Sequence, residues 1–418
     1  MDKDRASFQT NRVQHRAGRP HELWIWCLGL PLVWYHFHIV SPVSIIANVI
    51  LWIPLTVALI SGLLTAVLEA SGYRSGTGRD RCANGHCSRS LGSSNRWRPS
   101  MAYFWLPSPP GWLVFTFYAG IACVAFLKPE TYRKPVVLTS TVAWIAIAWM
   151  LAIRTPPSDR FVATFIDVGH GTSVLLQFPN GESWLYDAGR LGDAAFARWP
   201  IEAVLWSEGL RRLNGIVISH ADADHYNAIP GLLERFSVDR IVGSHELFAN
   251  TEPGMVELQI ALASRNVPVD KIAAGETMLS MPDVRVEVLH PTTQHLIGKD
   301  NANSIVLKID CFGHSLLLPG DLENPGTGIL LAQSQPIAGG VLMAPHHGSL
   351  SQDIYPILRW SRPAAVVASG GERAIDPRVI TGLSETGADA YITARDGTVR
   401  VQFDASGFHI RTWNHDPW

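Results

Sequence analysis

The residues best suited to chemistry lie together in the segment Ser219–His225. His220, Asp222, Asp224 and His225 place four metal-binding side chains within six residues. The segment follows a β-type run and precedes a helix-like run, which is typical of a loop at the end of a strand. Imidazole and carboxylate groups together suit Zn²⁺ or Mn²⁺, and one short loop can supply ligands to two neighbouring ions. The pattern therefore favours a metal site over an acidic surface turn.

Two further strand ends carry groups of the same kinds. The apolar run 316–319 ends in Gly320-Asp321, and the run 341–344 ends in Pro345-His346-His347-Gly348-Ser349. Each motif alone is weak, because Gly-Asp is a common turn and paired histidines are common on surfaces. Three such strand ends in one region are much harder to explain by chance, and they predict one shared site.

Together these motifs resemble the metallo-β-lactamase fold, in a variant similar to the C-terminal domain of the ComEC family of DNA-uptake proteins. Asp167-Val168-Gly169-His170-Gly171 and the run 301–307 add to the resemblance, which covers roughly residues 160–412. The resemblance implies a four-layer αββα sandwich. The alternation of strands and helices by itself supports only a layered α/β domain.

We expect two divalent ions, Zn²⁺ or Mn²⁺, about 3.5–4 Å apart, which would activate a water molecule for attack on a phosphorus or carbonyl centre. The predicted metal ligands are His220 and Asp222 for the first ion, Asp224, His225 and His346 for the second, and Asp321 as the bridge. The predicted catalytic residues are Asp224, His347 and Ser349. The last two would contact a substrate phosphate or protonate the leaving oxygen. The sequence does not decide between His346 and His347 as the ligand.

The clear motifs leave the first ion without a third ligand. The candidates for additional contacts are His170, His290, Asn301, Asn303 and Asp376. By the resemblance, His170 stands where most family members have Gln, and Asp376 stands where they have the histidine of a Gly-His-Pro motif. Both are departures from the family pattern.

The charge of the 418-residue chain is unevenly distributed. Residues 1–153 carry 14 Lys and Arg against 6 Asp and Glu, a net charge of +8, whereas the remainder carries −10. The basic part is also the most apolar, which is typical of membrane spans with flanking charge. Five cysteines are scattered without a paired spacing, so no disulfide framework is expected.

The apolar part predicts an all-α transmembrane region of about four helices. Residues 1–22 form a basic tail, and residues 23–153 form the transmembrane region, a shortened competence domain by resemblance. The expected spans are 23–40, 45–68, 112–127 and 136–153, each near the length that crosses a bilayer. Residues 71–100, with six arginines and one acid, predict a disordered loop. The hydrolase domain is expected over 158–412.

These features predict a multi-pass protein of the cell membrane. Four spans and the arginine-rich loop place the hydrolase domain on the cytoplasmic side, whereas the family resemblance places it at the outer face, so its side stays open. The expected partners are DNA, the lipid bilayer and other DNA-uptake proteins. Because the hydrolase domain is acidic overall, DNA binding would depend on the metals and on local basic residues such as Arg395 and Arg400.

Three functions are compatible with the sequence. The first is a membrane-anchored, metal-dependent nuclease or phosphodiesterase that acts on DNA during uptake. The second is a hydrolase of another substrate, such as a lactam, a thioester or a small phosphodiester. The third is an inactive remnant of a DNA channel protein, which the short membrane region and Asp376 suggest. Metal content separates the third function from the others, and a substrate panel separates the first two.

Overall fold

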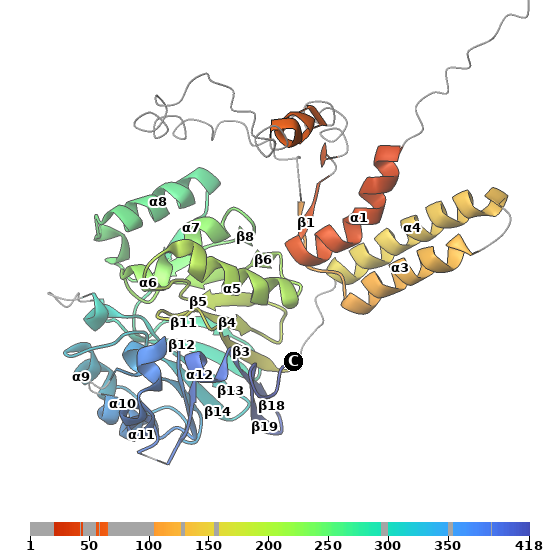
Figure 1. The fold of residues 1–418 in the computed structure, drawn as a ribbon. Coiled ribbons are helices and arrows are strands. Elements are labelled where there is room, and N and C mark those ends of the chain that lie inside the picture. The colour runs from red at the N-terminus through yellow and green to blue at the C-terminus, as the bar shows by residue number, and fades with distance from the viewer. Residues whose placement is uncertain are drawn as a thin grey trace, which may run out of the picture. The chain divides into compact units, whose positions relative to one another are not determined.

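The computed structural model describes residues 21–41, 43–44, 56–57, 59–65, 104–126, 130–153, 159–293, 300–349, 354–385 and 387–418. The chain divides into two compact units, Met1–Ala152 and Ile153–Trp418, and each is described by itself (Figure 1). Nearly all of the predicted tail, the predicted loop 71–100 and most of the predicted span 45–68 lie outside the described residues.

Helices occupy the other three predicted spans of the N-terminal unit. They are α1 (His21–Phe37), α3 (Gly111–Ala125) and α4 (Glu130–Ile153), and a short antiparallel pair joins β1 (Ile39–Val40) to β2 (Phe104–Trp105). Within the described part of the chain, none of the helices combines the length and the apolar character needed to cross a membrane. The prediction of about four transmembrane helices therefore stays a prediction.

Two tryptophans hold the N-terminal unit together. Trp34 on α1 and Trp144 on α4 are both buried, and their rings meet edge to face at 6.2 Å. The Trp34 indole donates a hydrogen bond to the carbonyl of Pro107 (2.8 Å), and the Trp144 indole donates to the carbonyl of Leu113 (2.7 Å). Each buried indole N–H is thus satisfied while its ring packs in the core.

Two β-sheets form the centre of the C-terminal unit. Within the described residues, the first sheet has eight strands in the order β10 (Val269–Lys271), β9 (Ile241–Gly243), β7 (Gly215–Val217), β5 (Ser183–Tyr186), β4 (Val174–Gln177), β3 (Phe161–Phe165), β18 (Val399–Asp404), β19 (Gly407–Thr412). The second has seven strands in the order β11 (Thr277–Ser280), β12 (Val284–His290), β13 (Val306–Cys311), β14 (His314–Leu318), β15 (Val341–Met343), β16 (Ala365–Ala368), β17 (Asp389–Ile392). A separate parallel pair joins β6 (Arg212–Leu213) to β8 (Ser237–Val238).

Helices cover the outer face of each sheet. The first face carries α5 (Ala194–Ser207), α7 (Ile229–Leu232) and α8 (Pro253–Arg265), and the second carries α9 (Gly326–Leu331), α10 (Ile354–Ser361) and α11 (Pro377–Leu383) (Figure 1). On the second face, Leu317, Leu342 and Val366 pack against buried residues of α10 and α11. This arrangement is the αββα sandwich expected from the sequence.

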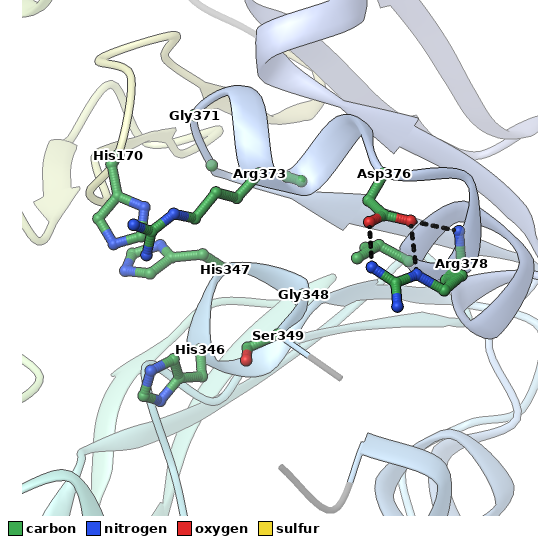
Figure 2. Close-up of a pocket in the computed structure, with 12 residues that line it drawn as sticks. His170, His346, His347, Gly348, Ser349, Gly371, Arg373, Asp376 and Arg378 are labelled. Atoms are coloured by element: carbon green, nitrogen blue, oxygen red, sulfur yellow. Dashed lines mark hydrogen bonds and ion pairs between the residues drawn. The ribbon is translucent and has the colours of Figure 1, made fainter. Parts of the chain in front are cut away.

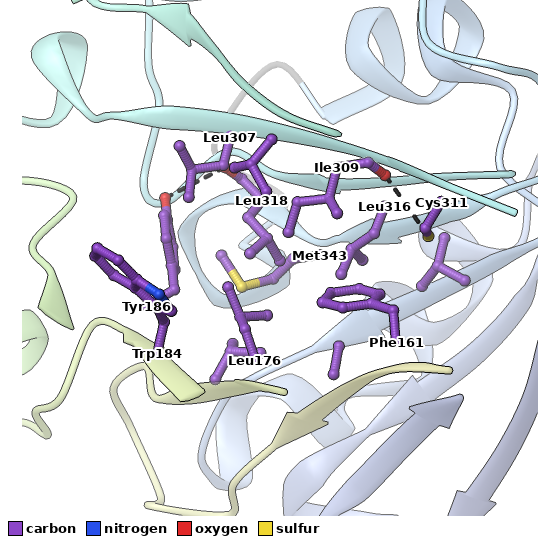
Figure 3. Packing of buried hydrophobic residues seen from close by; sticks show 14 of the residues in the cluster. Phe161, Leu176, Trp184, Tyr186, Leu307, Ile309, Cys311, Leu316, Leu318 and Met343 are labelled. Atoms are coloured by element: carbon purple, nitrogen blue, oxygen red, sulfur yellow. Dashed lines mark hydrogen bonds between the residues drawn. The ribbon is translucent and has the colours of Figure 1, made fainter. Parts of the chain in front are cut away.

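The main hydrophobic core lies between the two sheets. Alternate residues of the facing strands contribute to it, including Phe161 and Leu176 from one sheet and Leu307 and Leu316 from the other (Figure 3). Tyr186 at the end of β5 reaches across this core, where its hydroxyl is 2.6 Å from the carbonyl oxygen of Ile305 and 3.2 Å from that of Leu318. The two sheets are therefore fixed to each other beside the strand ends.

Parallel pairing brings the strand ends that carry polar residues to one place. Strands β5, β7 and β9 are parallel in one sheet, and β14, β15, β16 and β17 are parallel in the other. The carboxyl ends of parallel strands lie along the same edge of a sheet, which is where α/β proteins commonly form their sites. The segments after β5, β7, β14, β15 and β16 therefore share one region.

Candidate metal centre

The ligand loop follows β7 and passes directly into a short helix. Asp222 occupies the N-cap position of α6 (Ala223–Tyr226), which carries Asp224 and His225. The sequence predicted one helix over 227–236, whereas a second short helix, α7, begins at Ile229 with a proline in its first turn. Proline is favoured at the first turn of a helix and lacks the N–H needed further inside, which explains the interruption.

Four imidazole rings form a row at this edge of the sandwich. The ring centroids of His220 and His225 are 4.2 Å apart, those of His225 and His347 are 5.5 Å apart, and those of His347 and His170 are 4.6 Å apart. Two groups have potential ligand atoms that all lie within 4.8 Å of one another: His220 with His225 and Asp321, and His170 with Asp224 and His347.

Asp321 belongs to the first group and also contacts the second. Its Oδ1 is 3.4 Å from Nε2 of His225, and its Oδ2 is 3.4 Å from Nε2 of His347. Nε2 of His347 is also 3.4 Å from Oδ2 of Asp224. A carboxylate between two ligand groups is the arrangement expected of a bridging ligand.

Asp187 orients the ligand loop from behind. The Asp187 carboxylate is buried, and it accepts hydrogen bonds from the backbone N–H of Ser219 (2.7 Å), from the Ser219 hydroxyl (2.8 Å) and from Nδ1 of His225 (2.8 Å). Because a carboxylate only accepts, the His225 proton lies on Nδ1 and the Nε2 lone pair is directed into the cluster. The Ser219 hydroxyl donates to Asp187, so it accepts from Nδ1 of His220 (2.9 Å), which leaves the Nε2 lone pair of His220 exposed in the same way.

A close backbone approach keeps Asp187 and its neighbours against the ligand loop. Ala188 donates its N–H to the carbonyl of His225 (2.8 Å). A Cβ atom at Gly189 would lie 2.5 Å from the carbonyl carbon of Asp224, so a side chain there would displace the loop.

His347 is held by an equivalent contact. Its Nδ1 donates to the carbonyl of Ser369 (2.8 Å), at the end of β16, so its Nε2 also points into the cluster. His346 and His347 have φ values of 48° and 57°, a left-handed conformation that side chains rarely adopt. Such strain costs about 1–3 kcal/mol per residue and is concentrated at functional sites.

The unsatisfied atoms of the cluster fit a bound cation. The Nε2 atoms of His220, His225 and His347 are buried and have no hydrogen-bond partner within the described residues. Buried polar atoms are normally paired, and a site for an ion is one of the few reasons for an exception. Imidazole nitrogens with adjacent carboxylates form the donor set that Zn²⁺ and Mn²⁺ accept. The side chains present at this site therefore fit a bound Zn²⁺ or Mn²⁺ ion.

The charges of the cluster stabilise one another. Burial alone would raise the pKa of Asp224, but the close contact with His347 and the charges of His225 and His347 hold it at about 2. The pKa of Asp321 is likewise lowered by these two histidines despite its burial. Burial lowers the pKa of His225, and Asp321 and Asp187 more than reverse this, so its pKa is raised well above the usual value. A metal ion must therefore displace protons from the site.

Several predicted site residues lie elsewhere. His346, predicted as a ligand, belongs to neither group: its Nδ1 is 3.1 Å from Oε1 of Glu323 and 3.9 Å from Asp321, and Asn301 donates to the same Glu323 oxygen (3.1 Å). The left-handed backbone at both histidines turns His346 toward Glu323 and His347 inward. His290 is also outside both groups, because its Nε2 is directed to the carbonyl of Ala302 (2.8 Å).

Four further residues lie around the cluster. Asp222 has a half-exposed side chain whose Oδ2 is 3.4 Å from Nε2 of His220. Asn303 lines a cavity beside His220, and Ser349 lines another beside His347. Asp376 lines the second cavity too, but its carboxylate caps α11 and binds Arg378 (2.9 and 2.7 Å).

The basic residues predicted to contact DNA are engaged within the domain. Arg395 donates to Asp396 (2.7 Å), and Arg400 pairs with Glu208 and stacks on Trp418 with 4.1 Å between guanidinium and ring centre.

The sequence analysis did not identify the roles of Asp187 and Ser369. Asp187 could have been identified because it directly follows a predicted strand. The Ser369 contact uses a backbone carbonyl, which every residue has, so the residue type cannot predict it.

Comparison with known proteins agrees with this architecture. Residues 166–358 match the family model of the metallo-beta-lactamase superfamily, and residues 3–131 match that of the competence protein family. A metallo-β-lactamase domain implies divalent metal binding, consistent with the two ligand groups.

Among curated proteins, the chain is similar to ComE operon protein 3 of Bacillus subtilis, with 23% identity over 364 residues, 82% of this chain and 46% of that protein. It is 27% identical to competence protein ComA of Neisseria gonorrhoeae over 51% of this chain and 28% of that protein. The chain thus spans less than half the length of both relatives.

Among solved structures, Zn²⁺-bound PqqB from Methylobacterium extorquens is 16% identical over 53% of this chain and 85% of that chain, with a TM-score of 0.36, too low to support an argument. The two family matches and the two relatives agree with each other without it. The chain combines a region that matches the competence protein family with a region that matches the metallo-beta-lactamase superfamily, and this combination is consistent with a ComEC-family protein.

Proposed function

We propose that the C-terminal unit is a metal-dependent hydrolase that cleaves the phosphodiester bonds of DNA during its uptake. The observation that carries this proposal is the convergence on two carboxylates of three buried imidazole nitrogens, none of which makes a hydrogen bond within the described residues. The metallo-β-lactamase match supports hydrolysis, and the competence match supports DNA as the substrate. The other two functions lack an observation of comparable weight.

The ligand groups assign a role to each side chain. His220, His225 and Asp321 would hold one ion, and His170, Asp224 and His347 the other, with Asp321 between them and Asp222 at the rim. Compared with the sequence prediction, this proposal takes His347 instead of His346 as a ligand, adds His170, and moves His225 from the group of Asp224 to the group of His220. Divalent ions at these positions would lower the pKa of a water molecule and neutralise charge on the attacked and leaving oxygens.

The surrounding residues prepare the site for that chemistry. Asp187 and the carbonyl of Ser369 fix the His225 and His347 rings, so that their lone pairs require no rearrangement when a cation enters. Ser349 lines the cavity beside His347, where its hydroxyl would donate to an oxygen of the substrate.

We also propose that the N-terminal unit attaches the hydrolase to the cell membrane and works with other DNA-uptake proteins. Its α3 and α4 helices expose large apolar side chains, among them Phe115 (73% exposed) and Met150 (71%). Apolar surface of this kind marks contact with lipid or with another protein. The competence match over this region supports the same interpretation.

The test uses the full-length protein with Mn²⁺ or Zn²⁺ and three substrates: single-stranded DNA, a chromogenic lactam and a thioester. We expect metal-dependent cleavage of DNA that exceeds turnover of the other two. Equal cleavage rates with and without metal would contradict a metal-dependent nuclease. Activity on the lactam or the thioester alone would favour a different hydrolase. Absence of both metal and activity would favour the inactive remnant.

A further inference from the structure

A cavity of about 370 Å³ opens at the His170 end of the histidine row. We call it the Arg373 pocket, and its walls include His170, His347, Ser349, Gly371, Arg373 and Arg378 (Figure 2). Its volume is at the lower end of the range for ligand sites. Because two of the proposed metal ligands line it, a molecule in the pocket would lie directly beside the reacting bond.

Local packing places Arg373 at this position. The Ser369 hydroxyl donates to the carbonyl of Gly171 (3.0 Å), which holds the segment after β16 against the His170 loop. A Cβ atom at Gly371 would lie only 3.3 Å from the backbone nitrogen of His170, so glycine permits this close approach. The short helix η4 (Glu372–Ile375) begins there, and the Arg373 side chain extends from it toward His170 (Figure 2).

Arg373 supplies an uncompensated positive charge. Within the described part of the chain, no hydrogen bond or ion pair is made by its guanidinium group. The second arginine of the pocket, Arg378, is neutralised by Asp376, whose oxygens are 2.7 and 3.1 Å from its guanidinium nitrogens. Asp376 is thereby prevented from repelling an anion, while Arg373 keeps its full charge for a ligand.

The two ends of the histidine row open to cavities of different charge. Arg373 lies at the His170 end. At the other end of the row, the described residues that line the cavity beside His220 include Glu246 and Asp300 and no arginine or lysine. Among these described residues the two ends of the site therefore differ in charge, and an anion is favoured at the Arg373 end.

We propose that the Arg373 pocket binds a phosphate group of the DNA strand, next to the phosphodiester that lies at the metal ligands. The guanidinium offers two parallel N–H donors, which match two phosphate oxygens. Since residues 154–418 carry a net charge of −10, this local cation is needed to hold a polyanion at the site. The inference rests on the proposed nuclease function and adds the direction in which the strand leaves the metal centre: toward η4.

The experiment compares Arg373→Gln with Arg265→Gln in the full-length protein. Arg265 is exposed at the end of α8 and lines neither cavity, so its replacement removes the same charge elsewhere. Elemental analysis first checks that both variants keep the wild-type metal content. Two substrates are then used: a single-stranded oligonucleotide, which has neighbouring phosphates, and bis(p-nitrophenyl) phosphate, which has one phosphodiester only.

We expect Arg373→Gln to lower kcat/KM for the oligonucleotide about 10- to 100-fold, the effect of losing a hydrogen bond to a charged group. Turnover of bis(p-nitrophenyl) phosphate should change less than about threefold, because it places nothing in the pocket. Arg373→Lys should recover part of the loss, since it restores the charge without the paired donors. Equal losses on both substrates would overturn the assignment to a neighbouring phosphate.

A binding measurement separates this inference from the proposed function. Fluorescence anisotropy with the metal-free protein and a labelled oligonucleotide reports binding without cleavage. We expect Arg373→Gln to weaken binding about tenfold or more and to reduce the salt dependence by about one phosphate contact. Wild-type protein that binds DNA but never cleaves it would contradict the nuclease alone. Cleavage and binding unaffected by Arg373→Gln would contradict the pocket alone, and a wild-type protein that does neither overturns both.

Discussion

The substitution Asp187→Asn tests whether the ligand loop is held ready for metal. Asp187 is fully buried and accepts three hydrogen bonds, from Ser219 twice and from Nδ1 of His225. Asparagine has nearly the same shape but offers one acceptor oxygen and one donating amide group. If the oxygen keeps the Ser219 contacts, the amide faces Nδ1 of His225 and forces its proton to Nε2. The lone pair then points away from the cluster.

The size of the effect follows from that geometry. Changes to residues that orient metal ligands typically lower metal affinity 10- to 100-fold, which corresponds to about 1.4–2.7 kcal/mol. The loss should affect the group of His220, His225 and Asp321 before the other, because Asp187 contacts only the first. One metal equivalent should therefore dissociate at higher free metal concentration than the second.

The assay is metal content after dialysis against buffered free Zn²⁺ or Mn²⁺, with circular dichroism as a check on folding. Asp193→Asn is the matched control, because Asp193 caps α5 at the surface and asparagine caps helices equally well. We expect the control to bind metal like the wild type. Full metal affinity in a folded Asp187→Asn variant would refute the orienting role.

Three further predictions concern the same site and its frame. Asp224→Ala should abolish cleavage of single-stranded DNA with unchanged circular dichroism, and wild-type rates in this variant would remove Asp224 from the mechanism. Tyr186→Phe should lower the free energy of unfolding by about 1–3 kcal/mol in a denaturant titration, because the single hydroxyl proton shared by the Ile305 and Leu318 carbonyls is lost; an unchanged midpoint would contradict this. The pKa values of His225 and His347 are raised, so each is protonated below its folded pKa and competes with metal there. Apparent metal affinity should therefore fall as pH falls, by roughly tenfold per pH unit for each proton displaced, and isothermal titration calorimetry in several buffers would measure it. Affinity independent of pH would mean that these histidines are not ligands.

The sequence was informative where local pattern and strand ends carry the signal. The β-type run before the ligand loop and the apolar runs 316–319 and 341–344 predicted strands, and the structure contains β7, β14 and β15 at nearly the same residues. The prediction that Asp321 lies beside the ligand loop followed from three strand ends that needed to meet, whereas His220 and His225 were assigned to different ions and the structure groups them together. These features depend on side-chain periodicity and on parallel strand pairing, both of which are visible in residue order.

Other features depend on backbone geometry that residue types do not encode. His346 and His347 are adjacent and chemically identical, and only the left-handed backbone at both positions determines which one turns inward. The return of β18 to lie beside β3 in the first sheet joins residues more than 200 positions apart, and strand patterning alone cannot predict this pairing. Likewise, Arg400 was expected to face DNA, but its acidic partner Glu208 becomes its neighbour only through the fold.

The central claim is that side chains from three strand ends form one site for two metal ions, connected by Asp321. The most direct measurement is the number of divalent ions bound per chain, by elemental analysis of the full-length wild type and of Asp321→Asn after dialysis against buffered metal. We predict two ions in the wild type and a loss of at least one in the variant. A wild type without bound metal, or an Asp321→Asn variant that retains both ions at wild-type affinity, would contradict the account.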